Sequence, residues 1–225
     1  LRPFLSYLEE HKAKPFWINS GASNWNAVCC SGAGMLALAM YEDMPEAAGV
    51  LEKVEASFRP FIEHLETTDG GWEEGNGYWN YGMRYAFTYL RSWENAVGEK
   101  HPLLELPATR RTLDFPLDFT PNGRPCSFGD AGSWKPLPFH VEMAARYGDD
   151  NLLARLNQCL QATSGNRESW PDAIELLILH PGGETAPPVQ HGPVAELYHG
   201  LDWGFLADTM PNPQLYAAVR GGSSA

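Results

Sequence analysis

The protein has 225 residues, of which 44% are hydrophobic and 20% charged, and 28 acidic against 16 basic side chains give a formal net charge of −12. This composition suits a chain that buries a substantial core, and it excludes a disordered or disulfide-rich protein. The negative balance and the lack of any basic run argue against binding to nucleic acid or to an anionic membrane, because such binding needs clustered Lys and Arg.

The spacing of apolar residues predicts helix after helix as far as about residue 180. The ranges expected to be helical are 3–13, 24–41, 46–65, 78–97, 137–147, 151–162 and 170–179. The second of these contains four small residues, Ser31 to Gly34, which let another backbone approach closely. Helices joined by short connections stack on their neighbours, so we expect a set of helical hairpins.

After Pro181 the spacing of apolar residues no longer predicts helices. Short runs at 194–198, 203–207 and 215–219 favour strands over helices. Because three strands cannot bury their faces alone, we expect a mostly β domain to begin near residue 190 and to continue beyond this chain. The start at Leu1, without Met, also indicates a piece of a longer protein. Neither a signal peptide nor a membrane-spanning run is visible in the sequence.

Two polar segments rich in aromatic residues stand out. One is 20–26, SGASNWN, and the other is 69–81, DGGWEEGNGYWNY, which has four glycines, three acids and four aromatic residues. Indole and phenol rings offer apolar faces at little entropic cost, while amides and carboxylates supply directional hydrogen bonds, a combination that suits sugars. The alternative is a glycine-rich connection whose rings fill a core. The exposure of Trp72 and Trp79 decides between the two.

The remaining candidates for chemistry are weaker. Glu73 and Glu74 are adjacent in the chain, so they are poorly placed to flank one bond as a glycosidase pair. Asp130, in the turn at 128–132, either lines a site or caps the following segment. The histidines and the four cysteines lack the spacing of metal ligands, so no metal site is expected. Motifs for a P-loop, a dinucleotide site and a serine hydrolase are absent from the sequence.

Four segments taken together resemble the heparinase II/III-like polysaccharide lyases. They are Asn24-Trp-Asn-Ala-Val-Cys29, Asp69-Gly-Gly-Trp-Glu-Glu-Gly-Asn-Gly-Tyr-Trp-Asn-Tyr-Gly82, Phe128-Gly-Asp130 and Leu215-Tyr-Ala-Ala-Val-Arg-Gly-Gly-Ser223. The resemblance implies that residues 1–185 are the later helices of an incomplete (α/α) toroid, and that residues 190–225 are the first strands of an antiparallel β-sandwich. It also implies cleavage of uronic-acid polysaccharides by β-elimination, which leaves an unsaturated sugar.

The same resemblance sets expectations for partners and location. The partner would be an acidic polysaccharide or oligosaccharide, with no nucleic acid and no membrane, and the location would be the bacterial periplasm or the outside of the cell. No cofactor is expected in this chain, because the histidines and the divalent metal that other members carry belong to the part of the β domain beyond Ala225. The chain is therefore expected to hold only part of an active site.

A lyase of this kind must hold the uronate carboxylate, remove the proton on C5 and protonate the departing O4. The resemblance implies Asn24 for the carboxylate and Tyr78 for the acid, with the base as a second role of the same tyrosine. Asn26 and Tyr81 are the neighbouring alternatives for these roles. A tyrosine with its ordinary pKa of about 10 is a poor base at neutral pH, so positive charge must lower that pKa, and Arg84 follows on the same predicted helix.

The substrate-binding candidates are Trp25, Asn26, Trp72, Glu74, Trp79, Tyr81, Arg84 and Asp130. Trp25 is a departure from the family, since many members have His directly after the first Asn. A net charge of −12 repels a polyanion unless the cleft is locally basic. The arginines available for that purpose are Arg84, Arg91, Arg110, Arg111 and Arg124. Two alternatives stay open: a carbohydrate-binding toroid without catalysis, and a glycoside hydrolase that uses Glu73 or Glu74 with Asp130.

Overall fold

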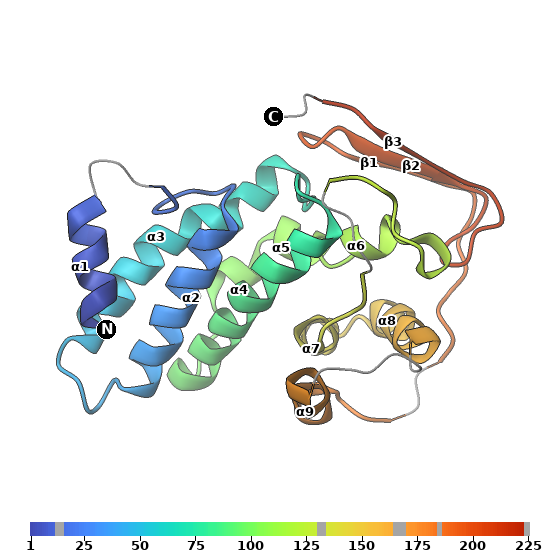
Figure 1. Ribbon diagram of the computed structural model, residues 1–225. Helices are drawn as coiled ribbons and strands as arrows, with labels where there is room; N and C mark the ends of the chain where they lie inside the picture. The colour runs from blue at the N-terminus through green and yellow to red at the C-terminus, as the bar shows by residue number, and fades with distance from the viewer. Residues whose placement is uncertain (12–15, 130–133, 164–169, 184–185, 223–225) are drawn as a thin grey trace. The chain divides into compact units, whose positions relative to one another are not determined.

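The computed structural model describes residues 1–11, 16–129, 134–163, 170–183 and 186–222. The fold is mainly helical, with a three-stranded antiparallel sheet near the C-terminus (Figure 1). The chain forms two compact units, the first made of Leu1–Thr67 and Tyr81–Thr109 and the second of Thr68–Asn80 and Arg110–Ala225. Within the described ranges no helix combines the length and the apolar character needed to cross a membrane.

Long helices make up most of the first unit. They are α1 (Arg2–His11), α2 (Asn24–Ala39), α3 (Ala47–Thr67) and α4 (Asn76–Val97), the last of which begins in the second unit. Helices α2, α3 and α4 lie side by side (Figure 1). Helix α3 buries a stripe of apolar residues at helical spacing, namely Val50, Val54, Phe58, Phe61 and Leu65. The predicted helices are thus confirmed, with ends that differ by a few residues.

Two glycines allow helices of the first unit to pack closely. A Cβ atom at Gly34 of α2 would overlap the ring of Tyr89 in α4, and a Cβ at Gly82 of α4 would overlap the side-chain oxygen of Asn24. A side chain at Gly34 would therefore have to displace the Tyr89 ring, and one at Gly82 would have to displace the Asn24 side chain. The close approach expected from the small residues of α2 is confirmed at Gly34.

Between α4 and α7 the chain makes short helical turns that the sequence analysis did not predict. These are η1 (Pro102–Glu105), α5 (Pro107–Arg111), α6 (Phe115–Asp118) and η2 (Pro121–Gly123). Each is too short to show a helical period, and each has proline at its start or in its first turn, where proline is tolerated. The second unit continues with α7 (Pro138–Arg146), α8 (Asp150–Thr163) and α9 (Trp170–Leu179), and α7 packs against both α8 and α9.

The sheet has the order β1-β2-β3, with β1 (Val194–Tyr198), β2 (Trp203–Ala207) and β3 (Tyr216–Arg220), and both pairings are antiparallel. The strands confirm the ranges expected from the sequence, with β3 displaced by one residue. One face of the sheet is buried against the second unit's own aromatic residues, with the ring of Trp203 5.8 Å from Phe115 and that of Phe205 5.9 Å from Phe119. The opposite face is exposed and wholly apolar, and its side chains are Ala195, Leu197, Leu206, Ala217 and Val219.

Candidate functional site

An aromatic pocket of about 360 Å³ lies in the first unit and includes Trp25 in its wall. Its lining consists of Phe4, Tyr7, Phe16, Trp17, Trp25 and Cys29. Trp25 is 55% exposed and Phe16 71% exposed, whereas Trp17 is buried. The Tyr7 ring stacks on Trp17 at 5.4 Å and on His11 at 4.0 Å, so its two faces are covered. We refer to this feature as the Trp25 pocket; Trp25 and Phe16 are the lining rings with the largest exposed surface.

Asn24 and Asn26 flank Trp25 at the start of α2, and both are buried. The Asn26 amide donates to the backbone oxygens of Trp17 at 3.1 Å and Ser57 at 2.8 Å. This amide ties the start of α2 to α3 and to the preceding loop. We therefore assign Asn26 a structural role in place of the expected contact with substrate. Asn24 lies against the Gly82 backbone and is 6% exposed.

The tyrosines expected to transfer protons lie along α4. Tyr78 is 40% exposed and Tyr81 is 43% exposed. They are three residues apart on the same helix, so their side chains share a face. The Tyr81 ring meets Tyr85 edge to face at 5.6 Å, which extends this row of phenols by one turn. Arg84 is half-buried and follows Tyr81 by three residues, so along the helix it neighbours Tyr81 more closely than Tyr78.

The glycine-rich connection before α4 packs tightly within the second unit. Gly70 has a positive φ of 85°, and a Cβ there would lie 2.7 Å from the Thr112 backbone nitrogen. Gly75 has a φ of 88°, and a Cβ there would come 2.5 Å from the Phe128 carbonyl oxygen. Two of the segments singled out in the sequence, 69–82 and 128–130, therefore meet at Gly75 and Phe128. Because Gly70 and Gly75 have no side chain, the backbone of this connection can lie close to the backbone at Thr112 and at Phe128.

Trp72 and Trp79 are fully buried. The Trp79 indole nitrogen donates to the Thr112 hydroxyl at 2.7 Å, and its ring contacts His140 at 5.1 Å. The Trp72 indole donates to the exposed Glu74 carboxylate at 3.3 Å. Neither ring offers a face to a ligand, so we assign both tryptophans to the core and not to a sugar-binding surface. Asp130 lies outside the described residues.

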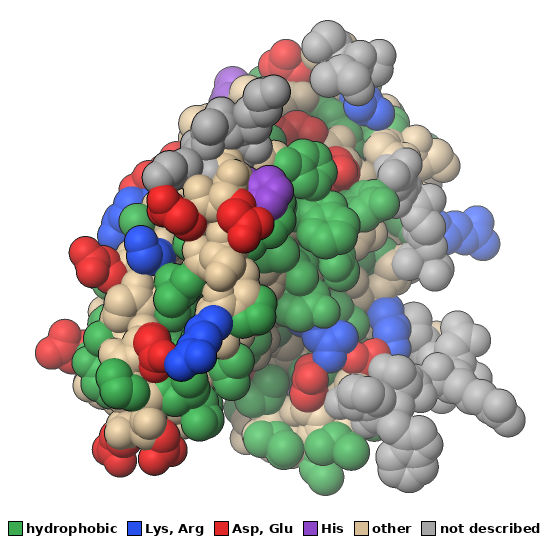
Figure 2. All heavy atoms as spheres, turned by 60° about the vertical axis from the view of Figure 1, so that its left-hand side comes forward, with side chains coloured by type: hydrophobic (Ala, Val, Ile, Leu, Met, Phe, Trp, Pro, Cys, Tyr) green, Lys and Arg blue, Asp and Glu red, His purple; other side chains and the backbone are tan. Residues whose placement is uncertain are grey.

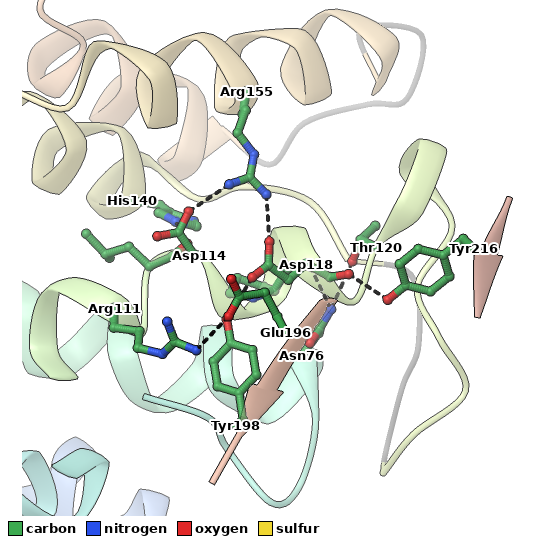
Figure 3. A network of polar contacts seen from close by, with 12 residues as sticks. Asn76, Arg111, Asp114, Asp118, Thr120, His140, Arg155, Glu196, Tyr198 and Tyr216 are labelled. Atoms are coloured by element: carbon green, nitrogen blue, oxygen red, sulfur yellow. Dashed lines mark hydrogen bonds and ion pairs between the residues drawn. The ribbon is translucent and has the colours of Figure 1, made fainter. Parts of the chain in front are cut away.

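Sequence reasoning missed a buried ionic network in the second unit (Figure 3). Arg155 of α8 donates to Asp114 Oδ1 at 2.7 Å and to Asp118 Oδ1 at 2.8 Å. Asp114 precedes α6 and Asp118 ends it, so one guanidinium group bridges the two ends of a single helical turn. A buried arginine of this kind is held by two carboxylates in a geometry that lysine cannot reproduce.

The sheet is joined to this network by two tyrosines (Figure 3). The Tyr198 hydroxyl donates to Asp118 Oδ2 at 2.9 Å, and the Tyr216 hydroxyl donates to the Asp118 backbone oxygen at 2.7 Å. Arg111 lies over the Tyr198 ring at 4.8 Å and forms an ion pair with Glu196 at 3.3 Å. Asp118 is therefore the residue at which α6, α8 and two strands meet.

Burial shifts the pKa values of Asp114 and Asp118 in the network and of His140 nearby. Burial, together with the charge of Asp118, raises the pKa of Asp114 to about 6, although the Arg155 charge acts in the opposite sense. Burial also raises the pKa of Asp118 against the effect of Arg155. The side chain of Asp114 keeps 39% of its surface exposed, so water screens part of its charge, whereas that of Asp118 is 13% exposed. Burial lowers the pKa of His140 to about 3, so this imidazole is neutral at physiological pH.

A pocket of about 290 Å³ opens beside this network. Asp114, Asp118, Arg111 and Arg155 line it together with His191 and Glu196. A carboxyl with a raised pKa beside a second carboxylate resembles a catalytic acid–base pair. Here, however, both carboxylates bind Arg155, and Asp118 also accepts from Tyr198, which indicates a structural role. Nowhere in the described ranges do three or more His, Cys, Asp or Glu side chains gather as a metal site would require.

The residues of the Trp25 pocket and those of the Arg155 network differ in whether a local sequence pattern could have found them. Phe4 and Tyr7 are three residues apart on α1, and Phe16 and Trp17 follow shortly afterwards. The density of rings in the first 25 residues was therefore a usable signal for the Trp25 pocket. The partners of Arg155 lie 37 and 41 positions away along the chain, and no local pattern reports such contacts.

No protein-family model matches the chain, and no curated protein matches it either.

Proposed function

We propose that the chain is part of a polysaccharide lyase that cleaves a uronic-acid polymer by β-elimination. The observation that supports carbohydrate binding is the Trp25 pocket, in which the rings of Trp25 and Phe16 are exposed and Trp25 directly follows Asn24 in the chain. The C–H faces of a sugar ring stack on exposed indole and phenyl rings, which provide a large contact area with few rotatable bonds. The motifs shared with the heparinase II/III-like lyases support the rest of the proposal.

Each candidate residue has a chemical role in the proposed elimination. The Asn24 amide donates to the uronate carboxylate, which makes the C5 proton more acidic. A tyrosine of α4, either Tyr78 or Tyr81, removes that proton and protonates O4 as the C4–O4 bond breaks. Arg84 supplies positive charge near Tyr81 on the same helix. The substantial exposure of both phenols supports their access to substrate.

The proposed fold is an incomplete (α/α) toroid followed by the start of a β-sandwich. Neighbouring antiparallel helices such as α2 and α3 support the toroid. The wholly apolar outer face of the sheet supports the sandwich, because a second sheet packed face to face covers such a surface. Acidic side chains are spread over the face of the molecule seen in Figure 2, with Lys and Arg between them.

Elimination is tested on the native-length protein that contains this chain, by the ultraviolet absorbance of the unsaturated uronate product on a panel of uronate polysaccharides. We expect either Tyr78→Phe or Tyr81→Phe to lower the rate by about 10²- to 10⁴-fold, because general acid–base catalysis is lost with the hydroxyl. Tyr41→Phe is the matched control, since Tyr41 is an exposed tyrosine at the end of α2. A rate unchanged in both test variants would contradict the assignment of the tyrosines.

Measurements of binding and of cleavage products distinguish a lyase from a carbohydrate-binding protein and from a glycoside hydrolase. A polymer that binds the native-length protein in a Trp25-dependent manner, with no absorbing product, would favour a carbohydrate-binding protein without catalysis. New reducing ends without absorbance, abolished by Glu74→Gln, would favour a glycoside hydrolase. The failure of every polymer on the panel to bind the folded chain would overturn the proposal.

A further inference from the structure

Asn24, which binds the uronate carboxylate in the proposed elimination, is held by two neighbouring helices of the first unit. Its backbone lies at the start of α2, where the Asn26 amide donates to the Ser57 backbone oxygen at 2.8 Å and so ties this end of α2 to α3. Asn24 is 6% exposed, and its side chain lies against Gly82 of α4. Contacts with α3 and α4 therefore fix the position of this amide.

The contact between Asn24 and α4 depends on the missing side chain at Gly82. A Cβ atom there would lie 2.1 Å from Asn24 Oδ1 and 3.2 Å from Phe61 Cζ. Non-bonded heavy atoms rest at about 3.5–4.0 Å from each other, so the Asn24 oxygen would have to move by more than about 1 Å. Any residue larger than glycine at this position therefore displaces the amide.

The same contact sets which end of the Asn24 amide faces α4. The oxygen is the side-chain atom of Asn24 that comes closest to Gly82, so the nitrogen branches away from that glycine. Only the nitrogen of an asparagine side chain donates hydrogen bonds. An amide turned the other way would present its oxygen to the uronate carboxylate and repel it. The orientation held by Gly82 is therefore the one that the proposed elimination needs.

We propose that Gly82 is a positioning residue for the elimination, because its lack of a side chain sets the orientation of the Asn24 amide that binds the uronate carboxylate. This inference rests on the proposed function, and Gly82 acts through Asn24 and not through contact with the substrate. Gly82 directly follows Tyr81, so the same turn of α4 carries a candidate acid–base group and the surface that orients the amide. A displacement of about 1 Å in such a group costs up to about 10²-fold in rate.

A positioning role at Gly82 is separable from a role in stability. The atom that a methyl group at Gly82 meets first is the tip of a flexible side chain, which turns aside at little cost. Alanine also favours a helix more than glycine does, which offsets that cost. At Gly34, by contrast, a methyl group meets the Tyr89 ring, 2.3 Å from Cε2. We therefore expect Gly82→Ala to lower the rate while the protein stays folded.

The test is a double-mutant cycle on the native-length protein that contains this chain, with elimination followed by ultraviolet absorbance. We expect Gly82→Ala to lower kcat by about 10- to 100-fold, to change KM less, and to leave the urea midpoint within about 0.3 M. In an Asn24→Ala background, which lacks the amide, Gly82→Ala should change kcat by less than about twofold. Gly32→Ala is the matched control with kcat unchanged, since a Cβ there meets nothing within 4 Å. Equal losses in both backgrounds would overturn the inference.

A second measurement follows the amide itself and needs no substrate. The side-chain N–H signals of Asn24 are observed by nuclear magnetic resonance in protein with isotope-labelled asparagine, and they are assigned by their loss in Asn24→Ala. We expect both signals to move in Gly82→Ala and to keep their positions in Gly32→Ala. Unmoved signals in Gly82→Ala would overturn this inference alone. Moved signals, together with no elimination of any uronate polymer by the unsubstituted protein, would overturn the proposed function and leave the orientation of Asn24 by Gly82 standing.

Discussion

The Tyr198 hydroxyl of β1 donates a 2.9 Å hydrogen bond to the Asp118 carboxylate at the end of α6. The Tyr198 side chain is buried and that of Asp118 is 13% exposed, and Asp118 also accepts from Arg155 at 2.8 Å. This contact spans 80 positions of the chain, and it ties the small sheet to the helices of the same unit. A sheet of three short strands needs such support, because it cannot bury both faces by itself.

Removal of this hydroxyl should destabilise the protein. In Tyr198→Phe the Asp118 Oδ2 atom loses its donor while it stays buried, which costs about 1–3 kcal/mol. The free energy of unfolding is measured in urea by circular dichroism. Tyr41→Phe is the control, and because Tyr41 is exposed we expect a change within about 0.5 kcal/mol. Equal stability of the two variants would show that the bond contributes nothing.

Loss of the Arg155 guanidinium group should lower the free energy of unfolding more than loss of the Tyr198 hydroxyl. Arg155→Met keeps most of the side-chain volume but leaves Asp114 and Asp118 without their shared counter-charge, and we expect a loss of about 3–5 kcal/mol. The same urea titration measures it. In the control, Arg2→Met removes an ion pair to Glu46 in which Arg2 is 84% exposed, and the expected change is within about 0.5 kcal/mol. A similar small effect of Arg155→Met would refute the importance of the network.

The pKa of Asp114 predicts a pH dependence with a definite sign. This carboxyl has a pKa of about 6 in the folded protein, where burial and Asp118 raise it, against about 3.9 in the unfolded chain. The folded protein therefore holds the proton more tightly, so the group favours folding below about pH 4, and this contribution is lost as the pH rises through about 6.

Asp114→Asn isolates this effect, because asparagine does not titrate. We expect the wild-type protein to lose stability relative to Asp114→Asn as the pH rises from about 4 to 6, with a constant difference above about pH 7. Urea midpoints at several pH values measure the difference between the two proteins. The comparison cancels the contributions of the titratable groups that lie away from Asp114, while Asp118, whose charge raises the pKa of Asp114, belongs to the effect that is measured. A difference that stays constant across the range would show that the pKa of Asp114 is not raised.

Two glycines of α2 provide a matched pair for helix packing. In Gly34→Ala the new methyl group would overlap the Tyr89 ring, and we expect a loss of about 1–3 kcal/mol. A Cβ at Gly32 meets nothing within 4 Å, so Gly32→Ala should stabilise the helix by about 0.5–1 kcal/mol. Thermal unfolding of both variants checks the opposite signs. The same sign in both would contradict the packing of α2 against α4.

Local patterns in the sequence were enough to predict the long helices and the strands. Apolar residues spaced three and four apart placed α3, and β-branched and aromatic runs between glycines and prolines placed β1 and β2. The short turns α5 and α6 escaped prediction, since four or five residues are less than two turns of a period. For the candidate site, the sequence singled out Trp25, which lines the aromatic pocket, but it did not bring Phe4 and Phe16 to the same place.

The sequence by itself determined the order and type of the main elements, because hydrophobic spacing and the residues that end helices act over a few positions. Only the tertiary structure decided which rings are exposed. Trp25 and Trp79 both lie in polar, aromatic segments, yet one is exposed and the other is buried against Thr112 and Phe139. Burial depends on which distant segments pack on a residue, and the bridging of Asp114 and Asp118 by Arg155 depends on the same long-range contacts.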